Sequence, residues 1–219
     1  YKDRDFYIAD PSFFEVPLND LISEKYLKTR SKLINKSQSV PNFKPGNIVH
    51  LQNNNIVAGT NFEKKSTTHI SIVDKNGNAV ALTSSIEFAF GSGITVGGFF
   101  LNNQLTDFSF FSKDKKGQLI ANRVEPNKKP RSSMSPSFVF NNDKLVGILG
   151  SPGGSKIICY VSKVAYEILF LNADPLSAVI SPHYCSKNKF TELENNNIDF
   201  ELEKYLKEKN HKIKYTNMT

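Results

Sequence analysis

Two short runs, 68–74 and 79–83, alternate between apolar and polar side chains. A period of two is typical of half-buried strands, because successive side chains of a strand point to opposite faces. The residues between the runs, 75–78, read Lys-Asn-Gly-Asn, and an Asn-Gly pair favours the tight turn of a hairpin. The pattern therefore predicts a β-hairpin with two hydroxyl residues, Thr67 and Thr68, at its first edge.

A second pair of strand-like runs, 137–140 and 145–149, stands on either side of an Asn-Asn-Asp turn. The glycine-rich residues 150–155 lead from it into 157–171, where apolar side chains recur every three or four positions. That period predicts a core-facing helix of about four turns. Two hairpins followed by a helix that packs on them predict an α+β layered domain.

Shorter patterns fill the rest of the chain. Helical spacing predicts a short helix or two within residues 1–29, a helix over 175–180, an amphipathic helix over 199–209 and a strand over 211–215. Residues 30–66 are rich in Lys, Asn, Ser, Gln and Pro, which predicts a long mobile loop. Residues 112–130 are highly charged and predict an exposed flap.

The composition is that of a chain able to bury a core, since 39% of the 219 residues are hydrophobic and 22% are charged. A formal net charge of +7 would permit an anionic partner. The lysines, however, are scattered through turns and polar segments rather than gathered in one stripe with interleaved aromatic residues. We therefore predict no nucleic-acid partner.

The two cysteines lie in different surroundings, Cys159 in an apolar helical run and Cys185 after a Ser-Pro-His turn. There is no CxxC pair, and the four histidines form no HExxH pair. We expect buried thiols rather than a disulfide, and neither a metal nor a cofactor. No apolar run is long enough to span a bilayer, and the chain begins with Tyr1 rather than Met, which suggests processing or a larger precursor and leaves the compartment open.

Five sequence blocks follow one another in a fixed order. They are TTHISIVD (67–74), NGNAV (76–80), LNNQLTDF (101–108), PRSSMSP (130–136) and GSPGGS (150–155). Together they resemble the small subunit of the gamma-glutamyltranspeptidases over about residues 67–215, and residues 3–17 resemble the end of that family's large subunit. The resemblance implies two regions: 1–66, a large-subunit tail with a polar linker, and 67–219, a catalytic region similar to the small subunit but lacking its last strands.

The resemblance implies an N-terminal-nucleophile hydrolase with an αββα sandwich, here incomplete, and a periplasmic or extracellular location. Such a precursor cuts itself before a threonine, which in this chain means between Ser66 and Thr67. A threonine at a new N-terminus carries its hydroxyl and a free α-amine in one residue, so the amine can take the hydroxyl proton. Thr67 would then attack a γ-glutamyl amide such as that of glutathione, and pass the acyl group to water or another amine.

Other positions of the family's pocket carry over by motif. Gly153 and Gly154 match the oxyanion hole, where backbone N–H groups near a helix start meet the developing negative oxygen. Ser132 and Ser133 match the residues that hold the α-carboxylate of the substrate.

Gln104 and Asp107 match the residues that hold the substrate α-amino group, and an acid beside an ammonium has the right sign. Two positions depart from the family pattern. Ser85 stands where well-studied members have a threonine that supports the nucleophile, and it lacks the methyl group that fixes a threonine rotamer. Glu87 stands where they have an asparagine, which retains ammonium binding but opens a preference for other acyl groups.

Other interpretations stay open. Taken singly, the hydroxyl pair, the serines and the glycines each have a structural explanation, as strand edge, turn and strand-to-helix connection. The family's large subunit supplies much of the sandwich and an arginine for the substrate carboxylate, so this chain would need a separate large-subunit chain or be a non-catalytic remnant. His69 follows the hydroxyl pair, and we interpret it as a packing or hydrogen-bonding residue rather than a base, because its side chain points away from Thr68.

Overall fold

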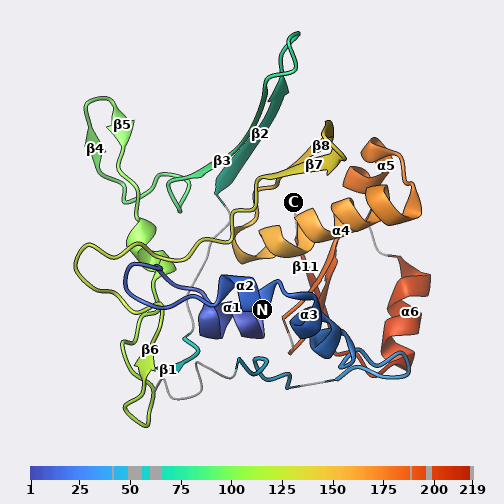
Figure 1. Ribbon diagram of the computed structural model, residues 1–219, viewed down its shortest axis with the longest axis horizontal. Helices are drawn as coiled ribbons and strands as arrows, with labels where there is room; N and C mark the ends of the chain where they lie inside the picture. Colours follow the sequence, from blue (N-terminus) through green and yellow to red (C-terminus); the bar gives the residue numbers. More distant parts are fainter. Residues whose placement is uncertain (41, 49–55, 60–65, 188, 196–198, 218–219) are drawn as a thin grey trace.

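The computed structural model describes residues 1–219 except 41, 49–55, 60–65, 188, 196–198 and 218–219 (Figure 1). Its N-terminal part contains α1 (Lys2–Tyr7), α2 (Leu18–Leu21), α3 (Glu24–Ser31) and the two-residue strand β1 (Ile56–Val57). Short helices are therefore confirmed here, three rather than one or two. Much of the predicted mobile loop lies outside the described residues, at 49–55 and 60–65.

A small buried cluster fixes α1. Tyr7 and Ile48 are each 4% exposed, and they are packed by Phe6, Leu21 and Tyr26. Burial of this kind stabilises by about 1.5–3 kcal/mol for each large apolar side chain. The position of α1 is thus set by its own core and not only by polar contacts.

The first predicted hairpin is present as β2 (Thr67–Val73) and β3 (Ala79–Ser85). The Asp74 carboxylate closes the turn by accepting the backbone N–H groups of Asn76 and Asn78, both at 2.8 Å. In Figure 1 this hairpin projects from the body of the molecule.

The register of the hairpin places Thr67 directly opposite Ser85. The His69 ring contacts the Thr83 hydroxyl through Nδ1 at 2.7 Å and lies against Gly150, where an added Cβ would come within 2.0 Å of it. His69 is therefore a packing and hydrogen-bonding residue, as expected. Its contact with Gly150 holds the base of the first hairpin against the end of the second.

The second hairpin and the helix after it also follow the prediction. The elements are β7 (Ser137–Asn141), β8 (Lys144–Leu149), the 3-10 turn η3 (Gly154–Lys156), α4 (Ile157–Leu171) and α5 (Pro175–Ile180). In Figure 1, α4 lies along the second hairpin. The buried residues of α4 are Ile157, Tyr160 and Lys163, all in its first two turns.

The C-terminal part forms a three-stranded sheet in the order β11–β10–β9. Its strands are β9 (Tyr184–Ser186), β10 (Thr191–Glu194) and β11 (Ile213–Thr216), with β10 antiparallel to β9 and parallel to β11. The helix α6 (Phe200–Glu208) connects β10 to β11, as a parallel pair requires. The predicted helix and last strand are confirmed, whereas β9 and β10 were not predicted.

The prediction of two free thiols is wrong, because Cys159 and Cys185 form a disulfide. The cysteines are 26 residues apart in sequence, but the chain doubles back through α5 and brings β9 against the first turns of α4. Their different sequence surroundings gave no sign of this proximity.

The prediction of an exposed flap over 112–130 is also wrong for its second half. Here β6 (Leu119–Ile120) pairs in parallel with β1, and Asn122 is completely buried. Lys128 is buried as well, with its ammonium 2.8 Å from the Glu125 carboxylate. Polar residues are buried here because they are paired with one another, a condition that hydropathy does not reveal.

A glycine turn and a short helix connect the first hairpin to this segment. The strands β4 (Thr95–Val96) and β5 (Phe99–Phe100) flank Gly97 and Gly98, which have φ angles of +60° and +87°. The backbone here therefore needs the freedom of glycine, as the sequence suggested. The 3-10 turn η2 (Gln104–Asp107) follows and faces the base of β3 through residues described below.

The first hairpin leaves apolar side chains uncovered. Ile70, Ile72, Val80 and Leu82 are each between 45% and 55% exposed. A hairpin inside a layered sandwich would bury one or both of these faces.

Among the described residues, no helix is both long and apolar enough to cross a membrane.

Candidate active site

Thr67 begins β2 and is half-buried. Opposite it, the Ser85 hydroxyl donates to the carbonyl oxygen of Ser66 at 3.4 Å, the carbonyl of the peptide bond that precedes Thr67. The Ser85 oxygen in turn accepts the backbone N–H of Glu87 at 2.9 Å. Ser85 is therefore oriented by one contact and reaches the predicted cut site with the other.

Glu87 lies in a tight corner after β3 and is only 4% exposed. Its φ of +74° is a left-handed conformation that is strained for a residue with a side chain. Asn103 fixes this corner from outside. Its side-chain oxygen accepts the backbone N–H of Phe88 at 2.9 Å, and its backbone N–H donates to the Ile86 carbonyl at 3.2 Å. These contacts bring Glu87 next to η2.

Gln104 and Asp107 lie at the two ends of η2, and the Gln104 amide donates to the Asp107 carboxylate. Asp107 is 6% exposed. Its backbone carbonyl accepts the side-chain amide of the buried Asn122 at 2.8 Å. The short helix is thereby held from behind while its carboxylate faces the site.

Ser132 and Ser133 lie in an extended segment that leads into β7. The Ser132 oxygen accepts the Met134 N–H at 3.0 Å, and Ser132 is exposed. Ser133 is 8% exposed and accepts a hydrogen bond from the Arg4 guanidinium at 2.5 Å. Both serines line the pocket described below, and a guanidinium group lies behind Ser133.

Gly153 and Gly154 form the connection between β8 and α4. Gly153 is buried with a φ of +133°, and an added Cβ would lie 2.6 Å from the Tyr160 ring. Gly154 has a φ of +56° and opens η3, which runs directly into α4. Both space and backbone conformation require glycine, and the adjoining helix start concentrates N–H groups with partial positive charge.

These segments meet in one pocket. It is lined by Thr67, Ser85, Glu87, Gln104, Asp107, Ser132, Ser133, Met134, Gly154 and Ile157, and it encloses about 270 Å³, part of it open to solvent. All the predicted binding and catalytic residues line it except Gly153, which directly precedes Gly154. Segments 90 residues apart in sequence are brought together here, although the sequence alone placed them together only through the family resemblance.

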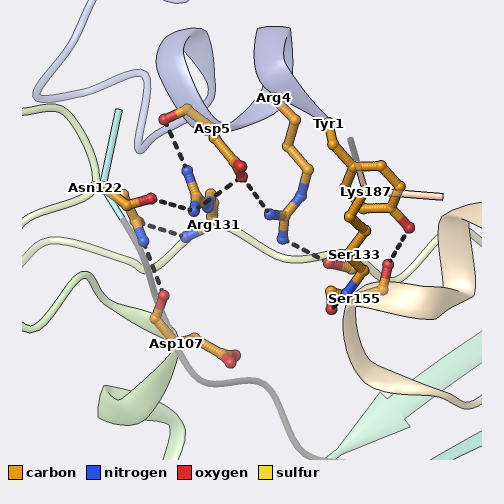
Figure 2. A network of polar contacts seen from close by, with 10 residues as sticks. Tyr1, Arg4, Asp5, Asp107, Asn122, Arg131, Ser133, Ser155 and Lys187 are labelled. Atoms are coloured by element: carbon orange, nitrogen blue, oxygen red, sulfur yellow. Dashed lines mark hydrogen bonds and ion pairs between the residues drawn. The ribbon is translucent and has the colours of Figure 1, made fainter. Parts of the chain in front are cut away.

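A buried polar network behind the serines was not predicted (Figure 2). Arg4 and Arg131 share the Asp5 carboxylate, at 3.2 and 3.3 Å. The backbone N–H of Arg131 donates to the Asn122 side chain at 3.0 Å, and Asn122 continues the network to Asp107. The only sequence signal was the position of Arg131 beside the serine pair.

A second set of contacts, also drawn in Figure 2, holds the start of η3. The Tyr1 hydroxyl donates to the Ser155 carbonyl at 2.7 Å, and the Lys187 ammonium donates to the Ser155 hydroxyl. These three residues come from the first, middle and last parts of the chain, so no local pattern indicated their contact.

The pocket has two electrostatic sides. The Glu87 and Asp107 carboxylates stand on one side, and the Arg4 and Arg131 guanidinium groups lie behind the serines on the other. Burial raises the pKa of the Tyr160 hydroxyl above its ordinary value, so the ring beside Gly153 is neutral. Within the part of the chain that the structure describes, there is no group of three His, Cys, Asp or Glu side chains able to hold a metal ion. With carboxylates on one side and guanidinium groups behind the other, the pocket suits a small zwitterion.

Known proteins resemble this chain in sequence and in fold. The sequence profile of the family described as Gamma-glutamyltranspeptidase matches residues 1–219. The chain is 36% identical over 194 residues to the glutathione hydrolase proenzyme of Escherichia coli, covering 84% of this chain and 31% of that protein. It therefore spans about three-tenths of that relative's length. It is also 31% identical over 185 residues to the putative inactive glutathione hydrolase 4 of Arabidopsis thaliana, covering 80% of this chain and 91% of that protein.

Solved structures are similar too. A crystal structure of a mutant Helicobacter pylori gamma-glutamyltranspeptidase superposes with a TM-score of 0.62 at 33% identity, covering 68% of this chain and 84% of that chain.

Proposed function

Because this chain belongs to the gamma-glutamyltranspeptidase family, whose solved members share its N-terminal-nucleophile hydrolase fold of mixed helices and strands, we propose that it carries the catalytic part of a gamma-glutamyltransferase or glutathione hydrolase. The chain is cut between Ser66 and Thr67, and Thr67 is the nucleophile. The observation that carries the proposal is the single pocket in which Thr67 and Ser85 meet a charged recognition site and Gly154.

The geometry at the start of β2 supports the proposed cut. The Thr67 hydroxyl oxygen adds to the Ser66 carbonyl carbon, the C–N bond breaks, and the hydroxyl proton moves to the nitrogen, which with the hydrogen that it already holds becomes the free α-amine. Water then hydrolyses the resulting ester and restores the Thr67 hydroxyl. The Ser85 hydroxyl, which already donates to the Ser66 carbonyl oxygen, stabilises the negative charge that develops there.

Turnover uses the same oxygen with a different carbonyl. The new α-amine takes the Thr67 hydroxyl proton as the oxygen attacks a γ-glutamyl amide. Backbone N–H groups at Gly153 and Gly154 stabilise the tetrahedral oxyanion, the leaving amine takes a proton, and an acyl-enzyme ester remains. Water or a second amine then attacks that ester and releases glutamate or a new γ-glutamyl amide.

Recognition follows the two sides of the pocket. Glu87, Gln104 and Asp107 bind the α-ammonium of the donor, and Ser132 and Ser133 bind its α-carboxylate. A carboxylate at Glu87 places two acids near the ammonium, which strengthens selection for a positively charged group at this position. No cofactor or metal takes part in these steps.

A further chain or region covers the first hairpin in the working enzyme. The half-exposed side chains Ile70, Ile72, Val80 and Leu82 form an apolar surface of the kind that the large-subunit part of such an enzyme would bury. We therefore assign the partner of this surface to the family's large subunit.

Two measurements on the longer protein containing this chain, or on the chain with its large-subunit partner, test the proposal. Mass spectrometry should find a new N-terminus at Thr67, and a γ-glutamyl p-nitroanilide should release p-nitroaniline. Thr67→Ala should abolish both, whereas Thr68→Ala, one residue along on the opposite face of β2, should preserve both. An intact precursor with no anilide turnover would refute the proposal.

A second candidate is a non-catalytic member of the family. It is favoured by the similarity to the plant relative named as putatively inactive, 91% of which is covered by this chain. Such a protein would remain uncut at Thr67 even when a large-subunit chain is supplied, which is the opposite outcome of the same experiment.

A further inference from the structure

We propose that Arg4 of α1, on the far side of the cut site, is a positioning residue that selects donors with an α-carboxylate, acting through Ser133. The proposal rests on the function proposed above. It assigns part of carboxylate recognition to the segment before the cut.

The contact between Arg4 and Ser133 defines how the serine can act. The guanidinium Nη2 donates to Ser133 Oγ at 2.5 Å. A guanidinium only donates, so the serine oxygen is an acceptor here and its O–H is directed away from Arg4. Ser133 lines the pocket, so the contact with Arg4 constrains the orientation of its hydroxyl there.

The charge behind the serines has the sign that a carboxylate needs. The side chains of Arg4 and Arg131 are 12% and 0% exposed, and both pair with Asp5. The two guanidinium groups place positive charge behind Ser133, beside the Asp5 carboxylate that they share. Because they are largely shielded from water, this charge acts on the pocket more strongly than a surface charge would.

The same network reaches the opposite side of the pocket. Asp5 binds Arg131, the backbone N–H of Arg131 donates to Asn122, and Asn122 donates to the Asp107 carbonyl (Figure 2). The groups that bind the carboxylate and the ammonium are thus fixed to one scaffold. Loss of Arg4 should disturb one end of this scaffold while the link from Asp5 to Asp107 persists.

A purely structural role of Arg4 would be to anchor α1, and three donor substrates separate that role from recognition of the carboxylate. These are the p-nitroanilides of γ-glutamate, of glutarate, which lacks the α-amine, and of 4-aminobutyrate, which lacks the α-carboxylate. Structural damage would lower turnover of all three alike. A role in carboxylate recognition would affect only the first two.

Arg4→Met in the processed enzyme should lower kcat/KM by about 10- to 100-fold for the γ-glutamyl and glutaryl donors, mainly through KM, because a hydrogen bond to a charged partner is lost. The 4-aminobutyryl donor should change by less than about threefold. Arg4→Lys should recover part of the loss, since it restores the charge but not the planar fork.

Arg30→Met is the matched control. Arg30 also pairs with an aspartate, Asp3 at 3.1 Å, but its contacts, with Asp3 and the Lys44 carbonyl, include no residue that lines the pocket. The Arg30→Met variant should leave the ratios of kcat/KM among the three donors unchanged.

Equal losses on all three donors, or no loss on any, would overturn the role of Arg4 while leaving the proposed function intact. Failure of the unmodified enzyme on every donor would instead refute the proposed function. If Arg4→Met is not processed, Arg4→Lys gives the decision: a loss confined to the γ-glutamyl and glutaryl donors supports the proposal, and an equal loss on all three donors, or no loss, overturns it.

Discussion

Reduction of the Cys159–Cys185 disulfide is expected to lower the free energy of unfolding by about 3.5 kcal/mol. The estimate comes from the loop that the bond closes. A separation of 26 residues gives a loss of chain entropy in the unfolded state of about 12 cal/mol/K, or about 3.5 kcal/mol at 25 °C. The bond also joins the first turns of α4 to β9, close to the glycines that precede the helix, so reduction should lower activity as well as stability.

Urea denaturation with and without dithiothreitol measures this change. With a urea dependence of about 2 kcal/mol/M, the midpoint should fall by about 1.5–2 M on reduction. A variant with both Cys159→Ala and Cys185→Ala is the control, and its midpoint should be insensitive to dithiothreitol. An unmodified protein whose midpoint and thiol titre do not change on reduction would show that the cysteines are not bonded, and the reasoning would fail.

Two further perturbations test the site and its surroundings. Ser85→Ala should slow self-cleavage by roughly 2- to 12-fold, the range expected for one lost hydrogen bond to the Ser66 carbonyl, while Ser85→Thr should retain the rate. A time course of the cut by mass spectrometry measures these rates. Equal rates for the unmodified protein and both variants would count against the role of Ser85. Burial, and then the nearby Lys163, lower the pKa of His183 below its ordinary value of 6.5. Below about pH 6.5 the unfolded chain therefore takes up a proton that the folded chain does not bind, so stability should decrease as the pH falls through this range and His183→Gln should flatten the profile in pH-dependent thermal melts.

The sequence predicted best those elements whose cause is local. The hairpin of β2 and β3 was predictable because its turn is closed by Asp74 and its strands alternate, and both features lie within 19 residues of sequence. The helix α4 was predictable from its period, and α6 because Asp199 caps it at the expected position. The pocket residues were predicted only through family motifs, since no local pattern relates Thr67 to Gly154.

The rest depends on contacts between distant segments. Arg4 and Ser133 are 129 residues apart, and neither residue type signals the other. Asn122 and Lys128 are polar residues in a charged segment, which predicts exposure unless the partners that neutralise them are known. Such partners become visible only when the chain is folded.

The proposed cut would change how α1 is held against Ser133 and Arg131. Before the cut, α1 and the serine segment belong to one molecule and meet at the high effective concentration that a tether provides. Afterwards they are held by non-covalent contacts across the cut, among them those of Arg4 and Asp5 with the serine segment and that of Tyr1 with Ser155. The cleaved protein thus becomes an assembly with a dissociation constant, and its activity should depend on how far it is diluted.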